Sequence, residues 1–143
     1  MGASVNAYWP GITERQRGSE PGFTNDCKSW GNWMAEREGE PAVYEALARL
    51  NAEELLTYKT DGVEDEEVGW VRPARLREAA ARLREAVRAG APETGVIVET
   101  YARNCNSPAD AAEEFVRDLD DIAALADWAE REGAAVMTLE VNW

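Results

Sequence analysis

The sequence predicts an α+β fold: a two-layer sandwich in which a small sheet of three or four strands has one face covered by three to five helices. The convincing strand segments alternate apolar and polar side chains, as in a sheet with one buried and one exposed face. The helical segments carry apolar residues at spacings of three and four, as on helices that cover such a sheet. No linker or repeat divides the chain, so we expect a single domain over residues 1–143.

The N-terminal half begins with a strand and continues into short helices. Its segments are expected to be a strand at 3–9, a long polar loop at 11–26, a short helix at 27–38 and a helix at 41–50. The strand ends at Pro10, and Pro41 lies in the first turn of the second helix. Asn51 then predicts a cap for a further short helix with the sequence AEELL.

The C-terminal half contains the longest periodic helix. Its segments are expected to be a short strand at 68–72, a helix at 73–89, a strand at 94–102, a helix at 108–132 and a strand at 134–143. Pro73 opens the first helix and Gly90 ends it, while Phe115 begins an apolar seam with 4-3-4-3 spacing on the second. Residues 94–143 therefore predict a β-α-β unit with parallel strands and a right-handed crossover.

Charge narrows the classes of partner. The chain has 28 acidic and 15 basic residues, a formal net charge of −13. This charge opposes direct binding to nucleic acid or to anionic lipid, and it favours either a basic partner or solubility alone. No apolar run is long enough to span a membrane and the N-terminus does not resemble a signal peptide, so we expect a cytoplasmic protein.

The residues that most enzymes rely on are missing. The chain has no histidine, and hence neither a Ser-His nor a Cys-His pair. Its glycines form no phosphate-binding motif, and its two cysteines, Cys27 and Cys105, are expected to be free thiols. We therefore expect no catalytic residues, no metal and no cofactor, with a carboxylate-based enzyme or ligand-binding domain as the remaining alternative.

Acidic residues gather in two segments. Residues 61–67 (DGVEDEE) are expected to form either a docking or cation-binding loop or a solvated connection. The helix at 108–132 carries nine acids against Arg117 and Arg131. The helix at 73–89 is basic instead, and we expect it to pair with acidic neighbours in the same fold.

Tryptophan and tyrosine mark candidate contact surfaces. Trp128 lies about 140° from the seam of its own helix, so it is either covered by another element, such as the loop at 11–26, or an exposed anchor with an acidic rim. Trp30 and Trp33 share one helical side and are expected in the core, with a shaped recognition loop as the alternative. A polar sheet face with Tyr8, Glu99 and Tyr101 could pair with a partner or with a second copy, so a homodimer is possible.

In its size, its acidic charge, its tryptophan-bearing surface and its lack of active-site motifs, the chain resembles the immunity proteins that bacteria keep against toxins. The resemblance implies a non-catalytic inhibitor that neutralises a basic toxin or nuclease through an acidic surface. The partner-binding residues would then be Trp128, Asp121, Asp118, Glu114, Asp127, Asp65 and Glu66. The alternative is an acidic DNA mimic or anti-defence inhibitor, which would display regularly spaced carboxylates.

Overall fold

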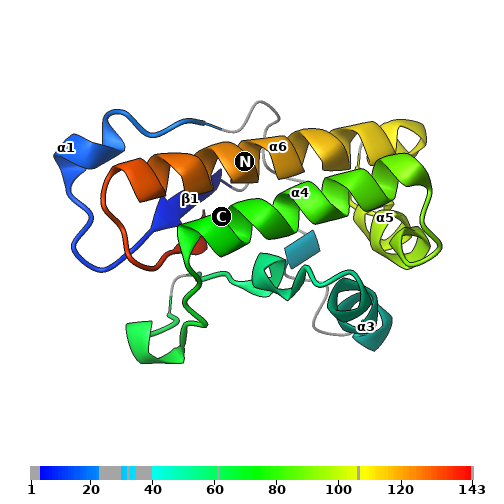
Figure 1. The fold of residues 1–143 in the computed structure, drawn as a ribbon, viewed down its shortest axis with the longest axis horizontal. Helices are drawn as coiled ribbons and strands as arrows, with labels where there is room; N and C mark the ends of the chain where they lie inside the picture. Colours follow the sequence, from blue (N-terminus) through cyan, green and yellow to red (C-terminus); the bar gives the residue numbers. More distant parts are fainter. Residues whose placement is uncertain are drawn as a thin grey trace.

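Two long helices form the main body of the protein in a computed structural model, which describes residues 4–22, 30, 31, 33, 34, 40–60, 62–105 and 107–142. Helices α4 (Pro73–Ala89) and α6 (Ala111–Arg131) lie side by side and run in opposite directions (Figure 1). Helix α5 (Thr94–Ala102) packs at the end where α4 stops and α6 begins. A two-stranded sheet packs on α6 towards the other end of the pair.

Helix α4 occupies the predicted range 73–89. Pro73 stands in its first turn, where the missing N–H costs nothing, and Gly90 ends it with a φ of 68°. The apolar stripe is buried at Leu76, Ala79, Ala80 and Leu83. The prediction of this helix is confirmed.

Helix α6 confirms the predicted seam. A 3-10 turn (Pro108–Asp110) precedes it, so the regular helix begins at Ala111. Every residue of the seam is buried: Phe115, Leu119, Ile122, Ala126 and Ala129. Asp118 and Trp128 are buried as well, so α6 is covered over more of its circumference than the seam alone.

The sheet is smaller than expected. Strands β1 (Ser4–Tyr8) and β2 (Thr138–Asn142) pair antiparallel, with Ala7 opposite Leu139. Val5, Ala7, Leu139 and Val141 are buried, as the alternation predicts, and the residues between them are exposed or half-buried except for Thr138, which is buried. Within the described residues the class is thus mixed α and β, but the sheet has two strands instead of three or four. The strand expected at 68–72 amounts to one bridge between Val71 and Met137.

The strand predicted at 94–102 is wrong, because this segment is helix α5. The β-branched residues of the segment favoured a strand, but Ile97 and Tyr101 lie one helical turn apart and are both fully buried. Tyr101 packs edge-on against Phe115 of α6, with ring centroids 4.9 Å apart. Tertiary packing therefore overrides local propensity, and the predicted parallel β-α-β unit does not form.

Helix α3 (Pro41–Arg49) confirms the helix expected at 41–50. Asn51 does not cap the next helix as predicted. Its φ is 56°, and the N–H of Ala52 donates to the carbonyl of Leu47 at 2.9 Å, which closes α3 in a left-handed turn. The following AEELL segment forms a 3-10 turn, η2 (Glu53–Leu56), rather than an α-helix.

The predicted loop at 11–26 contains a short helix in its described part. Helix α1 (Glu14–Arg17) begins at a capping box, in which Thr13 accepts from the Gln16 N–H and Gln16 accepts from the Thr13 N–H. Of the helix expected at 27–38, residues 30, 31, 33 and 34 are helical and the rest lies outside the described residues.

An aromatic cluster fills the core beside α5. The ring of Phe115 lies 5.7 Å from Trp30, 5.7 Å from Trp33 and 4.9 Å from Tyr101 between centroids. Trp33 donates its indole N–H to the hydroxyl of Thr100 at 3.0 Å. The expectation that both tryptophans lie in the core is confirmed. Among the described residues, no helix has the length and apolar character needed to cross a membrane.

Replacing Tyr101 by Phe tests the buried polar contact of this cluster. The Tyr101 hydroxyl donates to the carboxylate of Asp118 at 2.5 Å, and both side chains are buried. Phe keeps the ring but leaves the carboxylate with one donor fewer, which costs about 1–3 kcal/mol. We expect the free energy of unfolding in urea to fall by that amount. Tyr8→Phe is the control, since the Tyr8 hydroxyl is partly exposed, and equal losses for the two variants would contradict the expectation.

Candidate functional site

Part of the acidic surface expected on α6 forms ion pairs within the fold. Glu130 lies 2.8 Å from the guanidinium of Arg77, and Asp127 lies 3.6 Å from it. Asp120 lies 2.8 Å from Arg84. Both arginines belong to α4, so the expected pairing of the basic helix with acidic neighbours is confirmed. Asp127 is therefore a poor candidate for an unoccupied partner-binding carboxylate.

Asp118 is misplaced by the sequence prediction, which put it on the exposed acidic surface. Only 1% of Asp118 is exposed, and its carboxylate accepts from Tyr101. The residue follows Phe115 by three positions, which sets it beside the apolar seam and would have been a usable signal. Glu114 and Asp121, the other two acids predicted on this helix, are half-buried.

Trp128 is covered, so the exposed-anchor hypothesis is wrong and the alternative is confirmed. The side chain is 4% exposed, and its indole N–H donates to the hydroxyl of Ser19 at 3.1 Å. Its ring lies 5.2 Å from that of Trp9. Ser19 belongs to the 11–26 segment named as a possible cover. Gln16 of the same segment donates to the carbonyl of Glu132 and holds the cover in place.

A different aromatic pair lies on the outer face of the sheet. Tyr8 projects from β1 on the polar side, and its ring stacks on Trp70 with centroids 6.0 Å apart and planes at 30°. Both side chains are half-buried. The ammonium group of Lys59 lies 5.7 Å from the centroid of the Tyr8 ring, within the range of a cation–π contact.

Asp65, one of the predicted binding residues, joins this pair. It opens the 3-10 turn η3 (Asp65–Glu67) and accepts from the Tyr8 hydroxyl at 3.4 Å. Lys59 lies 3.8 Å from the same carboxylate. Burial and then the charge of Asp65 raise the pKa of Tyr8 above its ordinary value, so the phenol stays a neutral donor.

The remaining acids of this segment face solvent. Glu64, Glu66 and Glu67 are exposed and form no ion pair within the described residues. We call the surface made by Tyr8, Trp70 and the acids of residues 64–67 the outer-face site. The structure thus places Asp65 against Tyr8, which the sequence had not predicted, and Glu66 follows Asp65 in the same turn.

Two residues expected beside Tyr8 lie elsewhere. Glu99 and Tyr101 belong to α5, at the opposite end of the helix pair from the sheet (Figure 1). Trp70 was missed by the sequence analysis, although a tryptophan three residues after an acidic run was a usable signal.

A cavity of about 320 Å³ adjoins the outer-face site. Its lining residues are Glu53, Leu56, Thr57, Tyr58, Glu67, Gly69 and Val71. The Thr57 hydroxyl donates to the carbonyl of Gly69 at 2.7 Å and lies 2.7 Å from the Thr138 hydroxyl of β2. These two contacts connect Thr57 and Gly69, which line the cavity, to strand β2.

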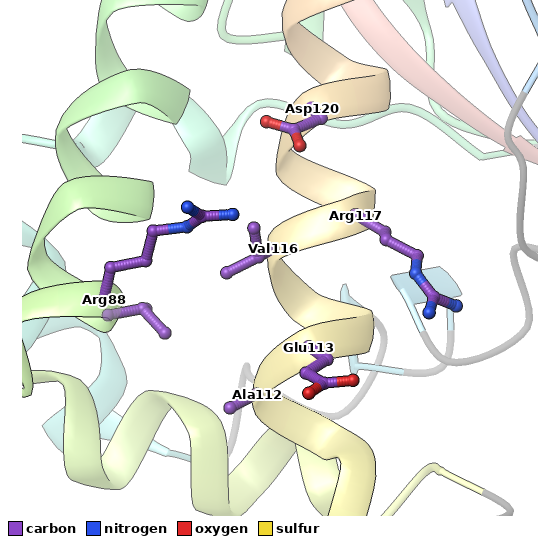
Figure 2. Close-up of a pocket in the computed structure, with 7 residues that line it drawn as sticks. Arg88, Ala112, Glu113, Val116, Arg117 and Asp120 are labelled. Atoms are coloured by element: carbon purple, nitrogen blue, oxygen red, sulfur yellow. The ribbon is translucent and has the colours of Figure 1, made fainter.

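A second cavity, of about 420 Å³, lies between α4 and α6. Figure 2 shows Arg88 reaching from α4 towards Val116 and Asp120 of α6. Arg117 and Glu113 also line it. Since Asp120 is already held by Arg84, the arginines outweigh the remaining acid, and this cavity is unsuited to a basic partner.

The free edge of β1 is capped by side chains. Arg17 donates to the carbonyl of Ala7 at 3.4 Å, and the carboxylate of Glu20 accepts from the Ala7 N–H. Arg17 also pairs with Glu20 at 3.4 Å and with Glu140 at 3.7 Å. Burial raises the pKa of the Glu20 carboxyl above its ordinary value, although Arg17 and Ala7 oppose this shift.

No group of three potential metal ligands occurs within the part of the chain that the structure describes. The thiol of Cys105 donates to the carbonyl of Tyr101 at 3.6 Å, and Cys27 lies outside the described residues. No protein-family model, curated protein or solved structure matches the chain.

Glu20→Gln tests the burial of the edge-capping carboxyl. A raised pKa in the folded state means that this group favours folding fully below its ordinary value of 4.5, and that the contribution is lost as the pH rises through the raised value. We expect wild type to gain free energy of unfolding relative to Glu20→Gln as the pH falls from 7 towards 4.5, measured by urea titration at each pH. Glu14→Gln, at an exposed position of α1, is the matched control. An identical pH profile for both variants would refute the assignment.

Proposed function

We propose that this protein is a non-catalytic binding protein of the immunity or inhibitor class, which neutralises a basic protein through the outer-face site. The observation that carries the proposal is the half-buried Tyr8–Trp70 pair, bordered by exposed acids that form no ion pair with any described residue. A partly buried aromatic pair supplies contact area at low entropic cost, as interface hot spots do. The acids supply the negative potential that accelerates encounter with a basic partner. We expect the protein to act in the cytoplasm.

The position of the free charge supports this function over the alternative of a DNA mimic. A mimic needs a regular row of exposed carboxylates, and α6 was the candidate for such a row. Asp120, Asp127 and Glu130 instead pair with arginines, while the exposed acids near the aromatic pair sit together in one turn. A turn of this kind suits one compact basic patch.

A carboxylate-based enzyme has less support. That hypothesis expects a pocket lined by two buried acids. In the described part of the chain, Asp118 is the only buried carboxylate, and it contacts Tyr101 within the core rather than lining either cavity. The acids that line the two cavities, Glu53, Glu67, Glu113 and Asp120, are all exposed.

Purification of the tagged protein from its native host at moderate salt, with identification of the retained protein, tests the proposed function. With the purified partner, Trp70→Ala should weaken binding by about 2 kcal/mol, or roughly 30-fold in Kd, as expected for an aromatic hot spot. Glu66→Lys should slow association, and the effect should shrink as salt is added.

Glu99→Lys is the control for these variants, because it makes the same charge change on α5, away from the sheet. It should leave both Kd and the association rate within about twofold of wild type. Retention of an acidic partner, or equal weakening by Glu99→Lys and Glu66→Lys, would count against the proposed function.

A further inference from the structure

The cavity beside the outer-face site joins apolar walls to carboxylates. Leu56, Tyr58 and Val71 supply the walls, and all three pack against the core from half-buried positions. Glu53 of η2 and Glu67 of η3 line it as well, and both are exposed. Two turns that are distant in sequence therefore contribute one acid each to the same cavity.

Neighbouring acids on the two turns are already neutralised by the chain itself. Glu54 lies 3.7 Å from Arg82, and Asp65 lies 3.8 Å from Lys59. Glu53 and Glu67 form no ion pair within the described residues. Arg82 and Lys59 thus pair with acids beside the cavity and not with Glu53 or Glu67, which line it. The lining of the cavity therefore carries a net negative charge.

This combination matches one kind of side chain. A long basic side chain buries its methylene stem against apolar surface while its charged end stays polar. The planar guanidinium carries five donors and can bond carboxylates on two sides at once, which a compact ammonium does less well. Gly69, which also lines the cavity, accepts a hydrogen bond from Thr57 at its carbonyl, and a carbonyl oxygen can accept two.

We propose that this cavity receives an arginine side chain of the basic partner. The inference rests on the proposed function and names the residue by which the partner anchors itself. Trp70 stands between Gly69 and Val71 in the chain, so an arginine in the cavity brings the adjoining partner surface against the Tyr8–Trp70 pair.

Titration with blocked arginine (N-acetyl-arginine amide), followed by two-dimensional amide NMR of the labelled chain, tests the cavity directly. We expect saturable shifts at Thr57, Gly69 and Val71 with a Kd on the order of millimolar, as suits a single side chain at an accessible site. Blocked citrulline keeps the shape but not the charge, and it should produce no saturable shift. Absence of saturable shifts with blocked arginine, or equal binding of blocked lysine, would overturn the arginine assignment.

Two variants separate the shape of the cavity from its charge. Gly69→Leu adds bulk at the lining without changing charge, and a Cβ built at Gly69 meets no heavy atom within 4 Å. It should weaken binding of blocked arginine at least tenfold. Glu67→Gln should weaken it about threefold to fivefold, whereas Glu45→Gln, an equal charge change at an exposed position of α3, should leave it unchanged.

The same variants distinguish failure of this inference from failure of the proposed function. Wild-type binding of blocked arginine by Gly69→Leu, in a variant with the wild-type melting temperature, would overturn the cavity assignment. If Gly69→Leu also kept the natural partner while Trp70→Ala lost it, the proposed function would stand without the cavity. If neither Gly69→Leu nor Trp70→Ala weakened binding of the partner, the cavity assignment and the proposed function would both be contradicted.

Discussion

The packing of α6 against α4 is the interaction on which the rest of the structure depends. Helix α6 contacts α4 along its length, α5 near its start and β1 towards its end, so it connects both ends of the molecule. Burial of its apolar residues supplies most of the stabilisation, since exposed ion pairs contribute only about 0.2–1 kcal/mol each. The ion pairs that Arg77 and Arg84 form with α6 then determine which of its acids remain available to a partner.

This pairing decides where the surplus negative charge lies. A chain with a net charge of −13 repels itself, and the arginines of α4 relieve that repulsion between the two longest helices. Within the described residues, the acids without an ion pair include Glu66 and Glu67 of the short turn η3, whereas Asp65 of the same turn pairs with Lys59. The exposed acids beside the aromatic pair thus lie on a turn that takes no part in the ion pairs between α4 and α6.

Helices and strands are predicted best where the spacing of apolar residues agrees with residues that begin or end an element, such as Pro and Gly. Pro73, Gly90 and the seam from Phe115 place α4 and α6, and alternation places β1 and β2. Helix α5 could not be recognised from its residues, because TGVIVETYA carries β-branched side chains and owes its helical state to Phe115 of another element.

The candidate site was less predictable than the fold, for a physical reason. Helical periodicity places Trp128 away from its own seam, but its cover comes from Ser19, 109 residues earlier in the chain. The stacking of Tyr8 on Trp70 likewise joins a strand to a loop far from it in sequence. The periodicity of side chains is a property of one helix or strand, whereas the exposure of a side chain depends on which other segment packs over it.

The outer-face site is held in place before any partner arrives. The N–H of Lys59 donates to Leu139, and the N–H of Val141 donates to the carbonyl of Lys59, each at 2.8 Å, so the segment before the acidic turn is fastened along β2. Such preorganisation lowers the entropic cost of binding. The side chain of Lys59 extends over Tyr8 and towards Asp65, and it also donates to the carbonyl of Val63. The ammonium group of Lys59 thus already occupies the position between the Tyr8 ring and Asp65. A basic partner therefore gains most from Glu64, Glu66 and Glu67, which neighbour Asp65 in the chain and form no ion pair with any described residue.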